Sequence, residues 1–257
     1  MAKNRSIIML STGHACVDIY QGSVAALVPF FVAEHAYSYA AVSGIVLAAT
    51  LLSSVAQPAF GLLTDRWAMP WLLPVSTIVA GLGIALSGLL SGSYALTLAL
   101  VAVSGVGVAA YHPESARVAR LVSQGRHSAM GWFALGGNLG FVAAPLMVTA
   151  VVVSGGLRLS PLLMVPALAG SVLCLPVLRA LRKPALVISG NAVGAGTDDK
   201  ASFVKLSLAV VFRSIAFVGL STSISLYAQQ RVGGDVAAGT AALFVLYLGG
   251  AVGSVLG

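Results

Sequence analysis

Charged residues are scarce in this chain. Lysine, arginine, aspartate and glutamate make up only 8% of the 257 residues, whereas apolar residues make up 58% and the mean hydropathy is +0.98. A soluble domain of this length needs far more charge on its surface, so the composition excludes that class of protein. The solvent to consider is therefore the lipid bilayer.

Cysteines and catalytic signatures are also lacking. Cys16 and Cys174 fall inside apolar runs and offer neither a disulfide framework nor metal-site spacing, so we interpret them as small core residues. The sequence contains no Gly-x-Ser-x-Gly motif, no His-Glu-x-x-His motif and no pair of intramembrane aspartates. We therefore expect no enzymatic activity, no cofactor and no bound metal.

Long apolar runs are what the sequence does contain. A helix needs roughly 20 apolar residues to cross about 30 Å of hydrocarbon at ~1.5 Å per residue. The predicted fold is an all-α membrane protein with about seven full transmembrane helices and a partial eighth. The apolar runs are 7–32, 41–63, 71–91, 94–121, 128–154, 160–181, 207–228 and 240–257.

The net charge of +7 indicates membrane topology rather than nucleic-acid binding, because the basic residues lie in short segments between the apolar runs. With a cytoplasmic N-terminus, only Arg158 and Arg231 lie outside, and Arg213 lies within a span. This excess predicts a multi-pass membrane protein with its N-terminus in the cytoplasm. The eleven inside residues are Lys3, Arg5, Arg66, Arg117, Arg120, Arg126, Arg179, Arg182, Lys183, Lys200 and Lys205.

The first apolar run is predicted to be a retained helix. His14 and Asp18 interrupt it and no small-x-small cleavage site closes it, which argues against a signal peptide. The chain ends at Gly257 with no polar flank after the last run, so we expect a fragment of a longer protein.

One long polar connection follows the sixth run and is rich in glycine and alanine, which predicts a flexible cytoplasmic linker. Six helices, a linker and a new set of helices are the layout of transporters built from two repeated halves. We therefore expect an N-terminal six-helix bundle over 1–181, a linker over 182–206, and the start of a second half over 207–257.

The segment after the second run holds Gly61, Asp65 and Arg66. A glycine at this point lets two helices approach closely while the acid and the base lock their cytoplasmic ends together. The alternative is a charge pair that sets topology and has no role in a gate.

The end of the fourth run carries His112, Pro113, Glu114 and Arg117. Ionisable groups are costly in lipid and tend to be paired or functional there, and residues 114 and 117 share one face of a helix. Proline removes a backbone donor, which predicts a local break. Either the helix continues and places Glu114 roughly 10 Å below the membrane edge at ~1.5 Å per residue, or it stops and leaves a loop.

Asp18 lies about 11 residues into the first run, roughly 16 Å deep at ~1.5 Å per residue and near the bilayer midplane. Burial disfavours its charged form, which suits a group that binds and releases a proton. The alternative is a structural acid hydrogen-bonded to His14, one turn away. Tyr20 and Gln21 would supply polar groups to a cavity or to helix packing.

The fifth run contains Gly136, Gly140 and Ala144 at four-residue spacing, followed by Pro145, and this spacing predicts a flat ridge for close helix packing. Asn138 on this run either faces the cavity or braces a neighbouring helix. Arg213, in the seventh run, either attracts an anionic substrate or extends to the cytoplasmic membrane edge.

These motifs resemble the major facilitator superfamily, and in particular its fosmidomycin-resistance-type exporters. In that superfamily the aspartate and arginine after the second helix belong to the cytoplasmic gate. The fifth run is similar to its antiporter signature, with Ala144 in place of a usual glycine, and Trp67 to Pro70 replaces the usual basic cluster. The segments that carry the resemblance are Gly13 to Gln21, Gln57-Pro58, Gly61 to Arg66, His112 to Arg120, and Gly125-Arg126-His127.

The resemblance implies a proton-driven efflux transporter of the inner cell membrane, whose partners are the lipid bilayer, protons and a small molecule, with no nucleic acid. We expect alternating access, with Asp18, Glu114 and His112 in proton coupling and Tyr20, Gln21, Asn138 and Arg213 in the substrate cavity. Gly61, Asp65, Arg66 and Arg117 would form the gate. An uptake symporter, and a passive channel or a non-transporting membrane protein, remain the alternatives.

Overall fold

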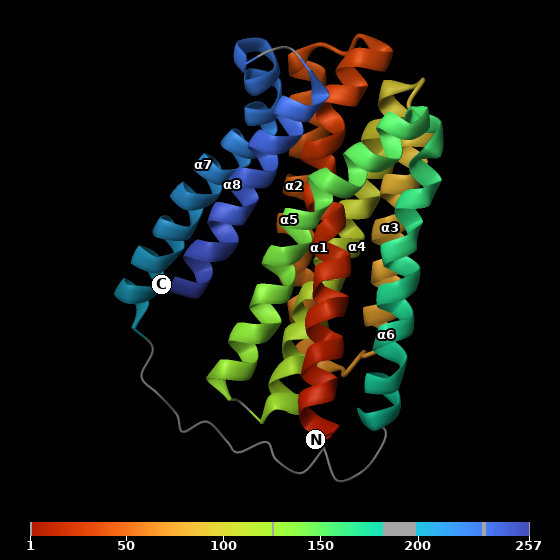
Figure 1. The fold of residues 1–257 in the computed structure, drawn as a ribbon. Helices are drawn as coiled ribbons and strands as arrows, with labels where there is room; N and C mark the ends of the chain where they lie inside the picture. The colour runs from red at the N-terminus through yellow and green to blue at the C-terminus, as the bar shows by residue number, and fades with distance from the viewer. Residues whose placement is uncertain (1, 125, 182–198, 233–234, 257) are drawn as a thin grey trace.

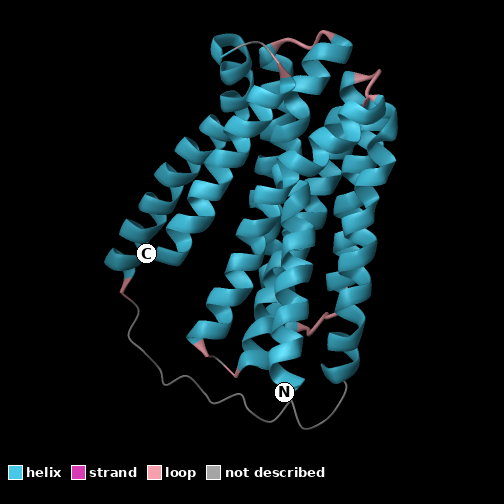
Figure 2. Ribbon diagram, viewed as in Figure 1, coloured by secondary structure: helices cyan, strands magenta, loops and turns pink. Residues whose placement is uncertain are grey.

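The computed structural model describes residues 2–124, 126–181, 199–232 and 235–256, and every regular element in these ranges is helical (Figure 2). In chain order the elements are α1 (Ala2–His35), α2 (Tyr39–Arg66), α3 (Leu72–Leu89), α4 (Tyr94–Ser123), α5 (His127–Gly155), the 3-10 helix η1 (Leu157–Met164), α6 (Val165–Leu181), α7 (Lys200–Val232) and α8 (Val236–Leu256).

Eight spans in the described residues are long and apolar enough to cross a membrane, with η1 and α6 together forming the sixth. This confirms the predicted all-α membrane bundle. The eighth helix was predicted to be partial, but α8 begins at Val236 and has 21 residues. At ~1.5 Å per residue that is about 30 Å, so α8 is long enough to cross the hydrocarbon.

Consecutive helices run in opposite directions (Figure 1). We call the end of the bundle where α1 begins the N side, and the opposite end the far side. Helices α7 and α8 lie side by side and flank the first six helices next to α5. This places α7 and α8 against one wall of the six-helix group.

Helix α1 forms the centre of the bundle. Of the residues in its apolar window 78% are buried, compared with none in α7, and α1 packs most extensively on α5. A Cβ atom at Gly136 or Gly140 of α5 would collide with the backbone carbonyl of Ser11 or Ala15. Further along the same ridge Ala144, which precedes the buried Pro145, lies against Gly22 of α1. Small residues therefore set the distance between these two helices.

The start of α7 corrects the predicted linker. Residues 200–206 were assigned to it but form the first turns of α7, whereas residues 182–198 lie outside the described residues. The reason is the cap that Asp199 provides. Its carboxylate accepts the Ser202 backbone N–H at 3.0 Å and the Ser202 hydroxyl at 2.6 Å, which satisfies donors of the first helical turn.

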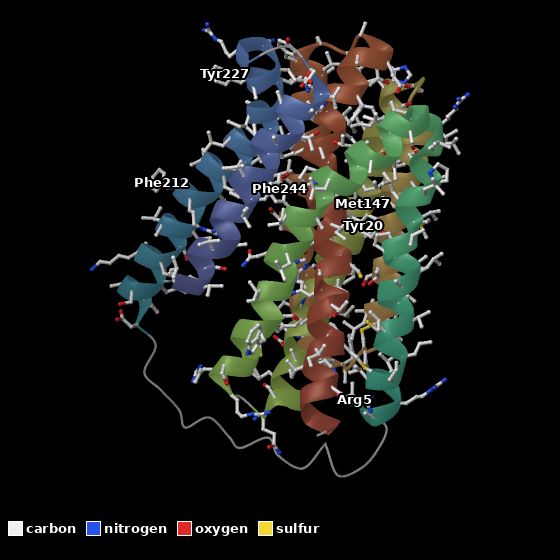
Figure 3. The ribbon with its side chains drawn as sticks, viewed as in Figure 1. Arg5, Tyr20, Met147, Phe212, Tyr227 and Phe244 are labelled. Carbon is white, nitrogen blue, oxygen red and sulfur yellow. The ribbon has the colours of Figure 1, made fainter. Side chains whose placement is uncertain are left out.

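The outward-facing surface of α7 is apolar, as contact with lipid requires. Phe203, Phe212 and Ile215 are all exposed, and Phe212 projects away from the bundle in Figure 3. Polar cavity-lining groups of the same helix, including Arg213 and Ser214, lie on the inner side. The two faces of α7 therefore contact different environments.

The described basic side chains are distributed unevenly between the two ends. Arg158 lies at the start of η1 and Arg231 at the end of α7, both on the far side. The N side carries Arg5, Arg66, Arg117, Arg120, Arg126, Arg179, Lys200 and Lys205. The side chains of Lys3, Arg182 and Lys183 lie outside the described residues. The asymmetry read from the sequence is therefore present in three dimensions.

The α1–α5 contact yields the first prediction. Gly140→Val should destabilise the bundle by about 1–3 kcal/mol, the usual cost of overpacking, because a Cβ there meets the α1 backbone. The matched control is Gly131→Val on the same helix, where a Cβ would meet nothing within 4 Å. Thermal unfolding in detergent measures both variants. Equal melting temperatures for the two would contradict the role of Gly140.

Candidate functional site

A cavity of about 420 Å³ lies between α1, α2, α4 and α5 on one side and α7 and α8 on the other. Arg213 is the one charged residue among its described lining residues. Hydroxyl groups supply much of the remaining polarity, from Thr50, Ser53, Ser104, Ser214, Ser221 and Ser254. Thr50, Ser104, Ser221 and Ser254 already donate to backbone carbonyls. The cavity therefore offers a solute a single positive charge and the hydroxyl donors of Ser53, Ser54 and Ser214.

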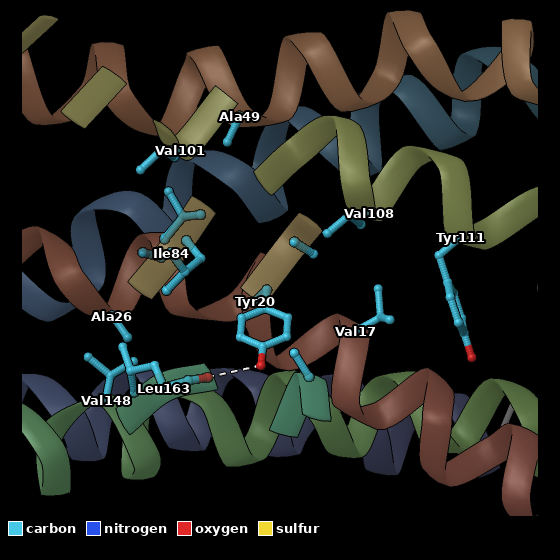
Figure 4. Close-up of a cluster of buried hydrophobic side chains, with 14 of the residues drawn as sticks. Val17, Tyr20, Ala26, Ala49, Ile84, Val101, Val108, Tyr111, Val148 and Leu163 are labelled. Carbon is cyan, nitrogen blue, oxygen red and sulfur yellow. Dashed lines mark hydrogen bonds between the residues drawn. The ribbon is translucent and has the colours of Figure 1, made fainter. Parts of the chain in front are cut away.

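The four residues predicted to line a cavity all border this one. Asn138 also donates from Nδ2 to the Ser254 hydroxyl at 2.7 Å, which braces α5 against α8. Tyr20 is fully buried and its hydroxyl donates to the Leu163 carbonyl at 2.9 Å (Figure 4). The Tyr20 hydroxyl therefore serves helix packing, the second of the two roles expected for it, while the residue still borders the cavity.

A second group of polar residues lies deeper in the bundle, and we call it the His–Asp cluster: His14 and Asp18 of α1 and His112 of α4. His14 Nε2 lies 3.3 Å from Asp18 Oδ2, and His112 Nε2 lies 3.3 Å from Asp18 Oδ1. The Asp18 residue is only 4% exposed. Two imidazoles from different helices therefore converge on one buried carboxylate.

Backbone carbonyls orient both imidazole rings of the cluster. His14 Nδ1 donates to the Phe133 carbonyl at 2.9 Å, and His112 Nδ1 donates to the Val108 carbonyl at 2.8 Å. The His14 ring also stacks on the Phe133 ring with centroids 4.4 Å apart. Each ring is therefore held with its Nε2 atom toward Asp18.

Gly137 of α5 leaves the space that the cluster occupies. A Cβ at this position would collide with Asp18 Oδ2 and would lie 2.9 Å from His14 Nε2. Such separations are too short for a carbon atom, so a larger residue would displace the cluster.

Glu114 is separate from the cluster, although the sequence grouped it with Asp18 and His112. It is fully buried, and both of its carboxylate oxygens accept hydrogen bonds from Arg117, with Nε at 2.9 Å from Oε2. Bidentate pairing of this kind is geometrically specific. Glu114 therefore has its charged partner on its own helix, whereas Asp18 has ring nitrogens on two helices.

Helix α4 continues through Pro113 as far as Ser123, which selects the first of the two predicted alternatives and corrects the expected local break. The His112 ring and its neighbours use the backbone groups around the proline. Ser115 donates to the His112 carbonyl at 3.0 Å. Local side-chain bonds of this kind keep a proline-containing membrane helix intact.

The predicted gate residues do not form one contact. Asp65 and Arg66 are exposed at the N-side end of α2, and Asp65 interacts electrostatically with Arg117. A Cβ at Gly61 would meet nothing within 4 Å. Gly61 therefore sets no close helix approach in this arrangement, although Thr64 of the same turn is buried.

Sequence reasoning missed several contributors to the site. His14 was considered only as a partner for Asp18, although its i, i+4 spacing on α1 was a usable signal. Phe133 and Gly137 carried no chemical signal at all, because one acts through a backbone carbonyl and the other through a missing side chain. The hydroxyl residues of the cavity are too common in membrane helices to stand out.

The sequence of the chain also matches a known protein family. The sequence matches the Major Facilitator Superfamily over residues 10–257, which is most of the chain. The chain belongs to this superfamily. Membership agrees with the eight spans that the described residues contain.

Two curated members of the superfamily are similar in sequence. The chain is 36% identical over 152 residues to the Fosmidomycin resistance protein of Escherichia coli (strain K12), covering 57% of this chain and 36% of that protein. It is 30% identical over 151 residues to the uncharacterized MFS-type transporter YfnC of Bacillus subtilis (strain 168), covering 58% and 37%. The matched region therefore spans about a third of these relatives.

Solved structures of other transporters share the fold. A bacterial homologue of the human drug peptide transporters PepT1 and PepT2 has a TM-score of 0.54 at 14% identity and covers 89% of this chain and 53% of that chain. Tetrameric PepTSo2 has a TM-score of 0.58 at 18% identity, covering 100% and 54%. At such identities the likeness concerns the arrangement of the helices alone.

The ion pair between Glu114 and Arg117 yields the second prediction. Arg117→Met should cost about 3 kcal/mol, the lower end for breaking a buried pair, because it leaves Glu114 charged and unpartnered while Arg117 itself is partly exposed. The double variant Glu114→Gln/Arg117→Met should recover part of that loss. Unfolding in detergent measures the cycle, with Arg120→Met on the exposed face as control. A double variant no more stable than Arg117→Met would contradict the pairing.

Proposed function

We propose that the protein is a secondary active transporter of the inner membrane that exports a small solute in exchange for protons by alternating access. The cavity carries this proposal. It is bordered by four helices of the first six on one side and by α7 and α8 on the other. Rocking of these two groups about the cavity would expose it to each side of the membrane in turn. The predicted halves, 1–181 and 207–257, are the natural moving units.

The proposed solute is a small anion. Arg213 supplies a positive charge to a cavity whose described lining contains no carboxylate, and the hydroxyls of Ser53, Ser54 and Ser214 can donate hydrogen bonds to an oxyanion. A charged residue inside a membrane bundle is costly and is retained for a functional reason. Fosmidomycin is the first solute to test, since a relative is named for resistance to it.

The proposed coupling group is the His–Asp cluster, with Glu114 as a second acid. Asp18 is buried on the helix that packs on most of the other spans, so a change in its charge acts on the centre of the bundle. Asp65, Arg66 and Arg117 lie together toward the N side. They would stabilise the closed state of a gate there, with the N-terminus in the cytoplasm.

The alternatives are distinguished by flux. An uptake symporter would move the solute in the same direction as protons, whereas an exporter moves it in the opposite direction. A passive channel would conduct the solute without any response to an imposed pH gradient. Membrane vesicles of known orientation, checked by protease cleavage of a site placed ahead of Arg5, separate these outcomes and test the cytoplasmic N-terminus.

The third prediction concerns proton coupling. In the full-length protein, Asp18→Asn and Glu114→Gln should each abolish the response of solute flux to an imposed pH gradient, because neither amide can take up a proton at physiological pH. Vesicle uptake of labelled fosmidomycin measures this response. The control is Asp199→Asn, an exposed position where asparagine preserves the helix cap. Wild-type gradient dependence in both variants would refute the assignment.

The fourth prediction concerns the solute. Arg213→Gln should raise the KM for fosmidomycin export about tenfold, the equivalent of one charge-assisted hydrogen bond of ~1.5 kcal/mol. Lys205→Gln is the matched control, since Lys205 is an exposed cation of the same helix outside the cavity. The two KM values come from the same vesicle assay. An unchanged KM in Arg213→Gln would exclude an anionic contact at this residue.

A further inference from the structure

The His–Asp cluster has the geometry of a metal site. One ligand atom from each of His14, Asp18 and His112 lies within 4.8 Å of the other two, and all three belong to the packed part of the bundle. His14 and Asp18 are one turn apart on α1, whereas His112 comes from α4. Helix packing, not local sequence, therefore creates the convergence.

Both imidazoles of the cluster direct their Nε2 atoms toward the Asp18 carboxylate. Both Nδ1 atoms carry a proton, because each donates to a backbone carbonyl. A neutral imidazole protonated at Nδ1 presents a lone pair at Nε2. Two such lone pairs would then face the Asp18 carboxylate, which also consists of acceptors, so the cluster needs either a second proton on an imidazole or a cation between the three groups.

The Asp18 carboxylate also has an oxygen that lacks a hydrogen-bond partner in the described part of the chain. Its Oδ1 atom is buried and has no hydrogen-bond donor among the described residues. A buried carboxylate oxygen without a partner is strongly unfavourable. The nearest ring nitrogen, His112 Nε2, lies at 3.3 Å, longer than a charge-assisted hydrogen bond of about 2.8 Å.

The separations suit a metal ion instead. In a tetrahedral site with metal–ligand bonds of 2.0–2.1 Å, neighbouring ligand atoms lie about 3.3 Å apart. Each imidazole Nε2 atom lies 3.3 Å from a different oxygen of Asp18, so whichever oxygen binds the metal already has one ligand neighbour at this distance. The other separations between ligand atoms are at most 4.8 Å. Side-chain movements of about 1 Å would shorten them to about 3.3 Å.

The surroundings supply the outer shell and an access route. Backbone carbonyls that accept the Nδ1 protons are the usual second shell of metal-binding histidines, and they fix the tautomer that coordinates through Nε2. A hollow of about 630 Å³ borders His14 and His112 and is lined by Ser54, Gln57 and Ser115. Ser54 also lines the main cavity, so the two spaces are neighbours, and the hollow itself gives an ion and its exchangeable fourth ligand access to the cluster.

We propose that His14, Asp18 and His112 bind one divalent transition-metal ion of the zinc class, with a fourth position open to water or solute. Two imidazole nitrogens and one carboxylate favour Zn²⁺ or Co²⁺ over Mg²⁺ and Ca²⁺, which prefer oxygen ligands. The sequence predicted no metal, because the three ligands lie on two helices. This inference goes beyond the proposed transport and does not depend on it.

The test measures metal binding directly. The full chain is purified in nanodiscs with a tag that lacks histidine, treated with a chelator, and titrated with Zn²⁺ in a calorimeter. We expect one Zn²⁺ per chain and no heat from Mg²⁺. His14→Ala, His112→Ala and Asp18→Asn should each weaken Zn²⁺ binding roughly tenfold or more. Co²⁺ added to the wild-type chain should give the visible absorption bands of a four-coordinate ion, a readout that needs no variant.

The two control variants each remove a possible metal ligand that lies outside the cluster. His127→Ala removes an exposed histidine outside the cluster, and Cys16→Ser removes a buried thiol, so neither should change the affinity. Three results would each refute the proposed metal site. They are the absence of stoichiometric Zn²⁺ binding, binding that survives all three cluster variants, and binding that is lost in a control variant. If the wild-type protein binds Zn²⁺ but shows no transport, the proposed function is refuted and the metal site still stands.

Discussion

The close approach of α5 to α1 is the contact on which the rest of the structure depends. Gly136 and Gly140 place the α5 backbone against the carbonyls of α1, and Gly137 lies between them at the level of Asp18. In lipid there is no hydrophobic driving force between helices, so such contacts between small residues must supply the packing energy. The same approach brings the Phe133 carbonyl within reach of His14, so helix packing and the polar cluster form together.

Polar groups in the bundle follow from the absence of water in the hydrocarbon. Most buried hydroxyls donate to a carbonyl on their own helix or a neighbour, as Ser104 does to Ala80 at 2.8 Å. Glu114 satisfies its charge with Arg117 on the same helix. Asp18 differs, because its partners are ring nitrogens from two helices and one of its oxygens lacks a donor among the described residues. A buried group left in this state is available to take up a cation.

The cavity and the cluster lie at successive levels of one polar region. Arg213 and the hydroxyls face the larger space, and the hollow beside His112 meets it at Ser54. Solute and cation would therefore occupy adjacent sites bordered by the same helices. Such proximity allows occupancy of one site to alter the energy of the other, which is the physical requirement for coupled transport.

The sequence by itself determined the membrane fold, the positions of the spans and the family, because apolar length, charge placement and the motif around Glu114 are local properties. It also identified Asp18, Gln21, Asn138 and Arg213 as cavity or cluster residues, since polar groups are costly in a membrane helix. Only the tertiary structure decided that His112 meets His14 while Glu114 does not, and that the Tyr20 hydroxyl is used in packing. The reason is helix rotation: each helix can turn about its axis without changing its sequence pattern, and only packing against its neighbours selects the side chains that meet.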